Sequence, residues 1–251
     1  MQIGYCNHPR KNIYKEIEWI GKNGFDFVDL FLEEDRAVPE KVDSKKVKEL
    51  LRKYNLGAIG HLTYYLPFGS ASRILREAAI EEAKRYFKIF RGIGIKYVTV
   101  HTNWQGASFK IEQSIKFLIG SLKKLKKEAK KNNIVIMLEP IGSRENTISN
   151  IQKILKETKI PLHLDLGHAN LVSKPSKFIE AFGKRIVHVH AHDNSGKEDQ
   201  HLEMGKGNIN WIKTIKTLKK YYDGTITLEI FSGECAVLRF KNKLKKLWEE
   251  V

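Results

Sequence analysis

The sequence predicts a single (β/α)8 TIM barrel of the α/β class, and three observations carry this prediction. Short apolar runs of four to six residues alternate along the chain with longer runs whose apolar residues recur every three or four positions. The 251 residues divide into eight such pairs of roughly 31 residues each, a size typical of this barrel. No GxGxxG turn follows the first apolar run, which makes an open doubly wound sheet the second choice.

The short runs are the candidate strands, and the longer runs between them are the candidate helices. In chain order the strands are 2–5, 27–31, 56–61, 97–101, 135–139, 162–165, 186–190 and 225–230. Clear examples of helical spacing are 13–24, 73–94, 109–133 and 211–222, and several helices close on glycine or asparagine, as helix carboxyl ends prefer. No low-complexity linker divides the chain, so we expect one domain over residues 1–251.

The composition is that of a globular protein with a basic surface. Apolar residues make up 41% of the chain, and no stretch reaches the ~18 uninterrupted apolar residues of a membrane helix. The net charge of +16 could serve a polyanionic partner, but the lysine-rich run 123–131 favours the solvated outer face of a helix. In MQIGYCNHPRK (1–11), charged residues come too early to leave room for the apolar region of a signal peptide. Cys6 and Cys235 are far apart in the sequence and form no CxxC pair. We therefore expect a cytoplasmic protein without a membrane segment.

Side chains alternate across a strand, and the alternation here separates an aliphatic face from a polar one. In the strand 97–101, Val98 and Val100 share one face, whereas Thr99 and His101 share the other. The strands 135–139, 162–165, 186–190 and 225–230 follow the same pattern. The aliphatic face suits packing against outer helices, so the polar face is expected to point into the barrel.

An ionisable residue ends each strand from the third to the eighth. These residues are His61, His101, Glu139, Asp165, His190 and Glu229. Barrel enzymes build their active sites at this end of the strands. Imidazoles and carboxylates that face one another in a buried site need a cation or shared protons to offset desolvation. A His, Asp and Glu set without thiolate suits zinc, manganese, iron or cobalt, so the sequence predicts a divalent-metal site.

Three further candidates follow the sixth and seventh strands. His168 lies in DLGH, directly after the sixth strand, and Asp199 and His201 lie in a loop after the seventh. The glycines of MGKGN (204–208) could bend this loop back over the rim. A hydrogen-bonded core histidine is the alternative for His168, and a solvated loop is the alternative for the other two.

At these residues the chain resembles the xylose isomerase-like barrel superfamily, which includes sugar isomerases, sugar epimerases and endonuclease IV-type AP endonucleases. The resemblance covers the third to the eighth strand. It rests on GHLTYYLP (60–67), VTVH (98–101), LEP (138–140), LDLGHA (164–169), HAHDN (190–194), DQHLEMGKGNINW (199–211) and TLEI (227–230). The epimerase pattern implies one metal held by Glu139, Asp165, His190 and Glu229. It also implies that Glu139 and Glu229 are catalytic, one removing a proton from the substrate carbon and the other returning one on the opposite face.

The endonuclease IV pattern implies three zinc ions. One would be held by His61 and His101 with Glu139 bridging, the second by the epimerase set, and the third by His168, Asp199 and His201. Tyr64 falls where that family places a DNA-inserting tyrosine. The chain departs from the pattern in GYCNHPRK (4–11), where no histidine ends the first strand as that family's pattern has it. It also departs in VDLFLEED (28–35), which lacks the basic and aromatic DNA-facing segment. HDNSGKEDQHLEMGKGNINW (192–211) instead resembles a prokaryotic branch labelled sugar phosphate isomerase/epimerase.

Three hypotheses follow. The first is an isomerase or epimerase of a sugar or sugar phosphate that uses one to three divalent ions, zinc or manganese. Its substrate-binding candidates are Tyr64, Trp104 and Lys206, with Tyr65 and Phe68 as further aromatic wall residues. The second is an AP endonuclease-like zinc phosphodiesterase acting on DNA. The third is a barrel that binds a sugar or nucleic acid without turnover. His188 and His192 are expected to be inward-facing polar residues or donors behind the ligands.

Overall fold

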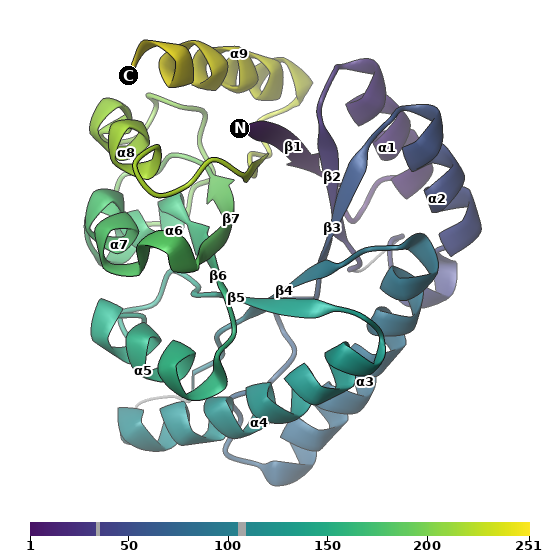
Figure 1. The fold of residues 1–251 in the computed structure, drawn as a ribbon, viewed down its shortest axis with the longest axis vertical. Helices are drawn as coiled ribbons and strands as arrows, with labels where there is room; N and C mark the ends of the chain where they lie inside the picture. Colours follow the sequence, from purple (N-terminus) through teal and green to yellow (C-terminus); the bar gives the residue numbers. More distant parts are fainter. Residues whose placement is uncertain (34–35, 105–108) are drawn as a thin grey trace.

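The computed structural model describes residues 1–33, 36–104 and 109–251, and it shows a closed barrel of eight parallel strands (Figure 1). The spatial order of the strands follows the sequence, and β1 pairs with β8 to close the cylinder. The strands are β1 (Gln2–Cys6), β2 (Phe27–Phe31), β3 (Gly57–His61), β4 (Tyr97–His101), β5 (Val135–Glu139), β6 (Leu162–Asp165), β7 (Ile186–Ala191) and β8 (Thr225–Leu228). The predicted (β/α)8 barrel is confirmed. Strand β8 ends earlier than expected, so Glu229 lies one residue past it.

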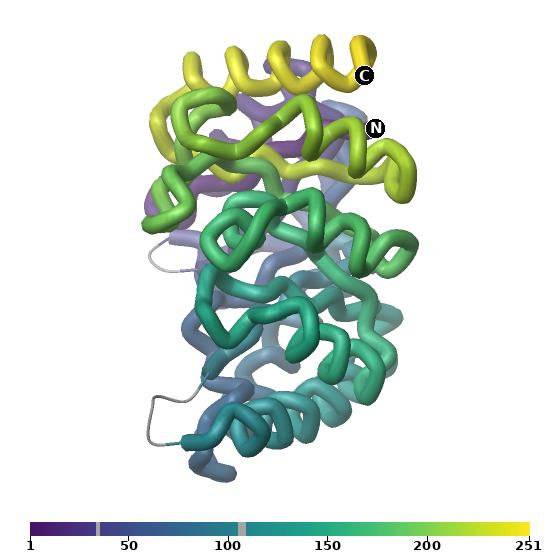
Figure 2. The backbone as a smooth tube through the Cα atoms, turned by 90° about the vertical axis from the view of Figure 1, so that its left-hand side faces the viewer, coloured from purple at the N-terminus to yellow at the C-terminus, as the bar shows by residue number. Residues whose placement is uncertain are grey.

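Helices surround the strands in the described part of the chain. They are α1 (Ile13–Lys22), α2 (Ser44–Lys53), α3 (Arg73–Ile93), α4 (Ile111–Lys131), α5 (Ile148–Thr158), α6 (Leu166–Val172), α7 (Pro175–Phe182), α8 (Trp211–Leu218) and α9 (Glu234–Glu250), with 3-10 turns η1 (Pro39–Lys41) and η2 (Gly183–Arg185). Capping side chains fix the first turn of several helices, because they accept hydrogen bonds from backbone N–H groups that would otherwise be unpaired. Asn12 caps α1 and Asp43 caps α2 in this way. Both termini lie at the end of the molecule that α9 covers (Figure 2).

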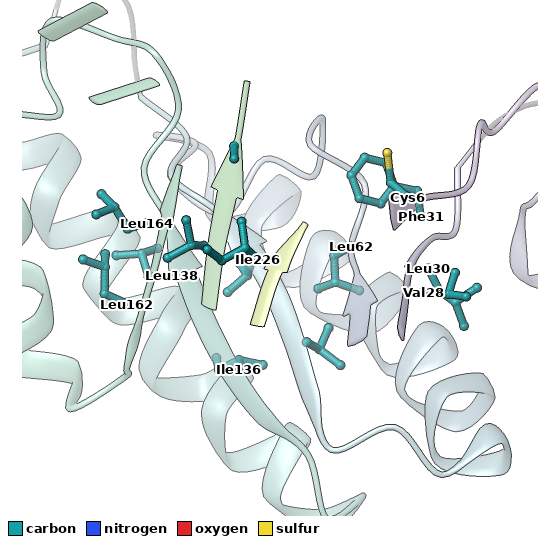
Figure 3. Packing of buried hydrophobic residues seen from close by; sticks show 14 of the residues in the cluster. Cys6, Val28, Leu30, Phe31, Leu62, Ile136, Leu138, Leu162, Leu164 and Ile226 are labelled. Carbon is teal, nitrogen blue, oxygen red and sulfur yellow. The ribbon is translucent and has the colours of Figure 1, made fainter. Parts of the chain in front are cut away.

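The main core lies between the strands and the helices, and it uses the aliphatic strand faces that the alternation predicts. Val98 and Val100 of β4 are buried there. Ile136 and Leu138 of β5 belong to the same core (Figure 3). Each such side chain contributes about 1.5–3 kcal/mol through burial. The opposite faces therefore point into the barrel, and they carry the polar residues described below.

The lysine-rich run lies on α4, and its side chains pair with neighbouring groups. Lys123 Nζ lies 3.0 Å from Glu157 Oε2 of α5. Lys126 Nζ donates to the carbonyl oxygens of Thr158 and Lys159, both at 2.9 Å, at the end of that helix. The prediction that this run forms an outer helical face is confirmed. Among the helices of the described residues, none combines the length and the apolar character needed to cross a bilayer.

Candidate metal centre

Glu139 is the point on which the predicted rim residues converge. Its Oε2 lies 3.2 Å from His61 Nε2 and 3.1 Å from His101 Nε2. Its Oε1 lies 3.4 Å from Nδ1 of His190, which comes from β7, two strands further round the barrel. These side chains are all buried, so the parallel strands bring the predicted residues to one mouth of the barrel.

Four of them, Glu139, Asp165, His190 and Glu229, form a compact group that we call the primary centre. One donor atom from each lies within 4.8 Å of those of the other three. His190 Nδ1 is 3.0 Å from Glu229 Oε2 and 3.7 Å from Asp165 Oδ2. Donor atoms around a tetrahedral zinc ion, with bonds of 2.0–2.2 Å, lie roughly 3.3–3.6 Å apart. The spacing of the primary centre therefore fits a single divalent ion.

Unpaired polar atoms test whether a cation suits this site. Asp165 Oδ1 accepts a bond from the backbone N–H of His168, but its Oδ2 is buried without a hydrogen-bond partner. The Nδ1 atom of His168 is buried and unpaired as well, and it lies 3.7 Å from Glu139 Oε1. Each unsatisfied group costs about 1–3 kcal/mol. A carboxylate oxygen and an imidazole nitrogen left unpaired at one mouth are the donors that a divalent metal takes, so the residues fit the ion.

Hydrogen bonds also fix which nitrogen of several histidines faces the carboxylates. A carbonyl oxygen can only accept, so His61 Nδ1 donates to Leu62 O at 3.1 Å and His201 Nδ1 donates to Glu229 O at 2.8 Å. In a neutral ring with the proton on Nδ1, Nε2 is unprotonated and carries a lone pair. In His61 this lone pair faces Glu139 Oε2. Two acceptors at such a distance repel unless a proton or a cation lies between them.

Asp29 is a functional residue that the sequence reasoning missed. It lies on β2, fully buried, and its Oδ2 is 2.7 Å from His190 Nε2. Thr227 Oγ1 donates to the same oxygen at 3.1 Å, and His188 Nε2 lies 3.4 Å away. A carboxylate behind a ligating histidine fixes the ring and its tautomer, here with Nδ1 toward the primary centre. The available signal was a lone acid between Phe27 and Phe31 on the inward face of an apolar strand.

The charges of the primary centre stabilise one another. Burial by itself would raise the pKa of Glu139, but His163, His190 and His101 hold that pKa well below its usual range. Burial would lower the pKa of His190, yet the carboxylates of Glu139 and Glu229 raise it well above its usual value. A bound divalent cation would take over the role of the histidine protons among these carboxylates.

The loop after β7 brings Asp199 and His201 to the same mouth. Asp199 Oδ2 lies 3.1 Å from His168 Nε2 and 3.3 Å from His201 Nε2. Burial would lower the pKa of His201, but Glu229 and Asp199 raise it to about 9. His192, which was expected to lie behind the metal ligands, belongs to this group as well. One of its ring nitrogens lies within 4.8 Å of a donor atom from each of His168, Asp199 and His201. We call His168, His192, Asp199 and His201 the loop cluster.

Asp193 holds this loop in place. Its Oδ2 accepts bonds from Gly205 N at 2.8 Å and Trp211 Nε1 at 2.9 Å. Gly205 has φ +82°, which favours glycine, and a Cβ on Gly207 would lie 2.2 Å from Asn194 O. The glycines of 204–208 therefore let the chain pack against residues 193–194, but the reversal that returns Asp199 and His201 to the rim lies earlier, between the antiparallel partners Asp193 and Leu202.

A cavity of about 500 Å³ opens above the centres. Its lining residues are Pro9, Phe31, Glu33, His61, Tyr64, His101, Ile141, Gly142, His168, Asp199, His201, Glu229 and Phe231. Tyr64 thus borders the site, with 63% of its surface exposed. Trp104 and Lys206 do not line the cavity: the first packs against the core, and the second is exposed on the loop. Phe68 is buried in the core, because its loop folds inward, and was wrongly expected at the wall.

Two relatives by sequence indicate the breadth of the group. An uncharacterized protein of Methanocaldococcus jannaschii, MJ1311, is 40% identical over 93 residues, which are 36% of this chain and 32% of that protein. A probable endonuclease 4 of Metamycoplasma arthritidis is 24% identical over 171 residues, 60% of each chain. The chain therefore matches about a third of the first relative and less than two thirds of the second.

Solved structures match over the full length. The crystal structure of a D-tagatose 3-epimerase-like protein has a TM-score of 0.91 at 26% identity and covers 100% of this chain and 98% of that one. The IolI protein with a bound zinc atom has a TM-score of 0.86 at 17% identity, with 100% and 99% covered, and shows the shared fold. A family model describing the xylose isomerase-like TIM barrel matches residues 17–250. With the closed barrel and the residues at its mouth, this match establishes that the chain belongs to the xylose isomerase-like TIM barrel family.

Proposed function

We propose that this protein is a divalent-metal-dependent isomerase or epimerase of a sugar or sugar phosphate. The observation that carries the proposal is the primary centre, where Glu139 and Glu229 both approach His190 Nδ1, at 3.4 and 3.0 Å, beside a cavity of sugar size. Similarity to the D-tagatose 3-epimerase-like structure supports the substrate class. Zinc or manganese is the expected ion.

The chemistry follows from the two carboxylates. When bound, the metal supplies Lewis acidity toward the sugar oxygens, which acidifies the neighbouring C–H group. Neighbouring histidines lower the pKa of both Glu139 and Glu229 against the effect of burial, so each carboxylate is deprotonated and able to accept a proton. One of them would remove the proton from the substrate carbon, and the other, after taking up a proton from solvent, would return it to that carbon on the opposite face. Asp29 keeps His190 oriented, and Tyr64 borders the space for the sugar.

Deuterium exchange tests this proposal. The metal-loaded protein is incubated in D2O with a panel of ketoses and ketose phosphates, and NMR follows loss of the C–H signal and formation of the epimer or aldose. We expect Glu139→Gln and Glu229→Gln to lower the exchange rate by about 10²–10⁴-fold, with metal content measured for each. Glu157→Gln on the surface of α5 is the matched control. Absence of exchange with every sugar, or undiminished exchange in both variants, would refute the proposal.

A second candidate is a zinc phosphodiesterase of the AP endonuclease type. The observation in its favour is that all nine residues of that pattern lie at one mouth, together with the similarity to a probable endonuclease 4. It predicts cleavage of a duplex with an abasic site, with binding that weakens steeply as salt rises. An abasic duplex that stays intact with zinc present would exclude it. Tight sugar binding without any turnover would leave a binding protein as the answer.

A further inference from the structure

We propose that His192 is the fourth protein ligand of a closed, structural metal site formed by the loop cluster, separate from the primary centre. The inference rests on the proposed function only in taking the barrel mouth to bind divalent metal. It assigns a role to a residue that neither the epimerase nor the endonuclease pattern uses. It also makes Asp199 and His201 ligands of a structural ion and not of a catalytic one.

The state of the His192 ring is the first observation. The residue is fully buried, yet neither of its ring nitrogens has a hydrogen-bond partner. Nε2 lies 3.1 Å from Asp165 Oδ1 and 3.6 Å from Asp199 Oδ1, but neither contact has hydrogen-bond geometry. Burial of an imidazole with both nitrogens unsatisfied destabilises the fold, so the position requires a partner of another kind.

The spacing of the loop cluster is the second observation. Asp199 Oδ2 is 3.1 Å from His168 Nε2 and 3.3 Å from His201 Nε2, and Asp199 Oδ1 is 3.6 Å from His192 Nε2. One donor atom from each of the four residues lies within 4.8 Å of those of the other three, and the separations from the Asp199 carboxylate are close to the roughly 3.3–3.6 Å between neighbouring ligands of zinc. His201 already donates through Nδ1 to Glu229 O, so its Nε2 lone pair faces the cluster in the neutral ring.

Packing around Gly167 is the third observation. A Cβ on Gly167 would lie 1.9 Å from His192 Cε1, so the imidazole occupies the space that a side chain would take. The glycine is therefore explained by the ring that lies against it. On the other side the ring stacks on His201, with centroids 4.0 Å apart. Position 192 is thus pressed between α6, which carries His168, and the loop that carries His201.

A fourth protein ligand has a chemical consequence. Three histidines and one aspartate fill a tetrahedral zinc site, and closed sites of this kind stabilise structure, whereas catalytic zinc keeps an open position. The loop cluster joins α6 to the loop 192–210 between β7 and α8, so its ion would hold that loop over the cavity. A phosphodiesterase would need the same ion to be open to water or phosphate. The geometry therefore favours the isomerase reading of the mouth.

Metal counting tests the inference. The purified protein is loaded with Zn²⁺ or Co²⁺, and bound metal is measured by elemental analysis and by competition with a chromophoric chelator. We expect at least two ions in the wild type and one fewer, or an affinity at least about tenfold weaker at one site, in His192→Asn. Co²⁺ in the loop cluster should give the strong visible absorption of a tetrahedral ion, which His192→Asn should lose. His8→Asn, a histidine outside both centres, is the matched control.

Gly167→Ala provides a second variant that leaves all four donors in the chain. Its methyl group should displace the His192 ring and weaken the same site, but it should add nothing further in the His192→Asn background. A His192→Asn protein with unchanged ion count, affinity and Co²⁺ spectrum would overturn the inference. So would a wild type with a single ion that Glu229→Gln removes. Loss of one ion in His192→Asn without turnover of any sugar would refute the proposed function and leave the site standing.

Discussion

Asp29 supports the primary centre from behind, and its replacement by asparagine should separate orientation from ligation. Asn keeps the size of the side chain but removes the charge that faces His190 Nε2 at 2.7 Å. A hydrogen bond to a charged group contributes about 1.5–3 kcal/mol, and a neutral one about 0.5–1.5 kcal/mol. The difference, of order 1–2 kcal/mol, corresponds to roughly five- to thirtyfold in metal affinity, which overlaps the lower part of the 10–100-fold range typical of residues behind metal ligands.

The assay is a competition titration of Zn²⁺ against a chromophoric chelator, with circular dichroism to confirm folding. Asp29→Ala is the harsher companion, because it leaves His190 Nε2, His188 Nε2 and Thr227 Oγ1 without their shared acceptor. We expect a larger loss of affinity in Asp29→Ala than in Asp29→Asn. A folded Asp29→Asn protein that binds zinc within twofold of the wild type would show that the carboxylate does not orient His190.

Three further predictions concern stability. Asp193→Ala removes the acceptor of Gly205 N and Trp211 Nε1, so the loop 192–210 should become sensitive to limited proteolysis, while an unchanged cleavage pattern would contradict the anchoring role of Asp193. Gly60→Ala places a Cβ 2.9 Å from the Phe90 ring and should lower the free energy of unfolding, measured by chemical denaturation, by about 1–3 kcal/mol. Gly94→Ala is not a suitable control for this crowding, because the left-handed φ of +101° at Gly94 would add backbone strain of its own. Removal of metal with a chelator should lower the melting temperature, because an ion present at 100 times its Kd contributes about 2.7 kcal/mol, and roughly 2–4 °C of melting temperature accompanies each kcal/mol; an unchanged melting curve would argue against a bound ion.

The rim residues were predictable because two simple regularities combine. Period-two alternation shows which side chains point into the barrel, and parallel strands place all carboxyl ends at the same mouth. His61, His101 and Glu139 therefore had to meet once the fold class was known. The same regularities say nothing of Asp193, whose hydrogen bonds decide where the loop with Asp199 and His201 lies.

The sequence by itself determined the barrel, the inward faces of its strands and the family of residues at its mouth, because these depend on short-range periodicity and on chain order. Only the tertiary structure decided that Asp29 supports His190 from 161 residues away and that His192 lies beside Asp199 over Gly167. Such contacts depend on strand tilt and on how the barrel closes, since these set which inward-facing side chains meet across the interior. Periodicity gives the direction of a side chain, but closure of the barrel chooses its partner.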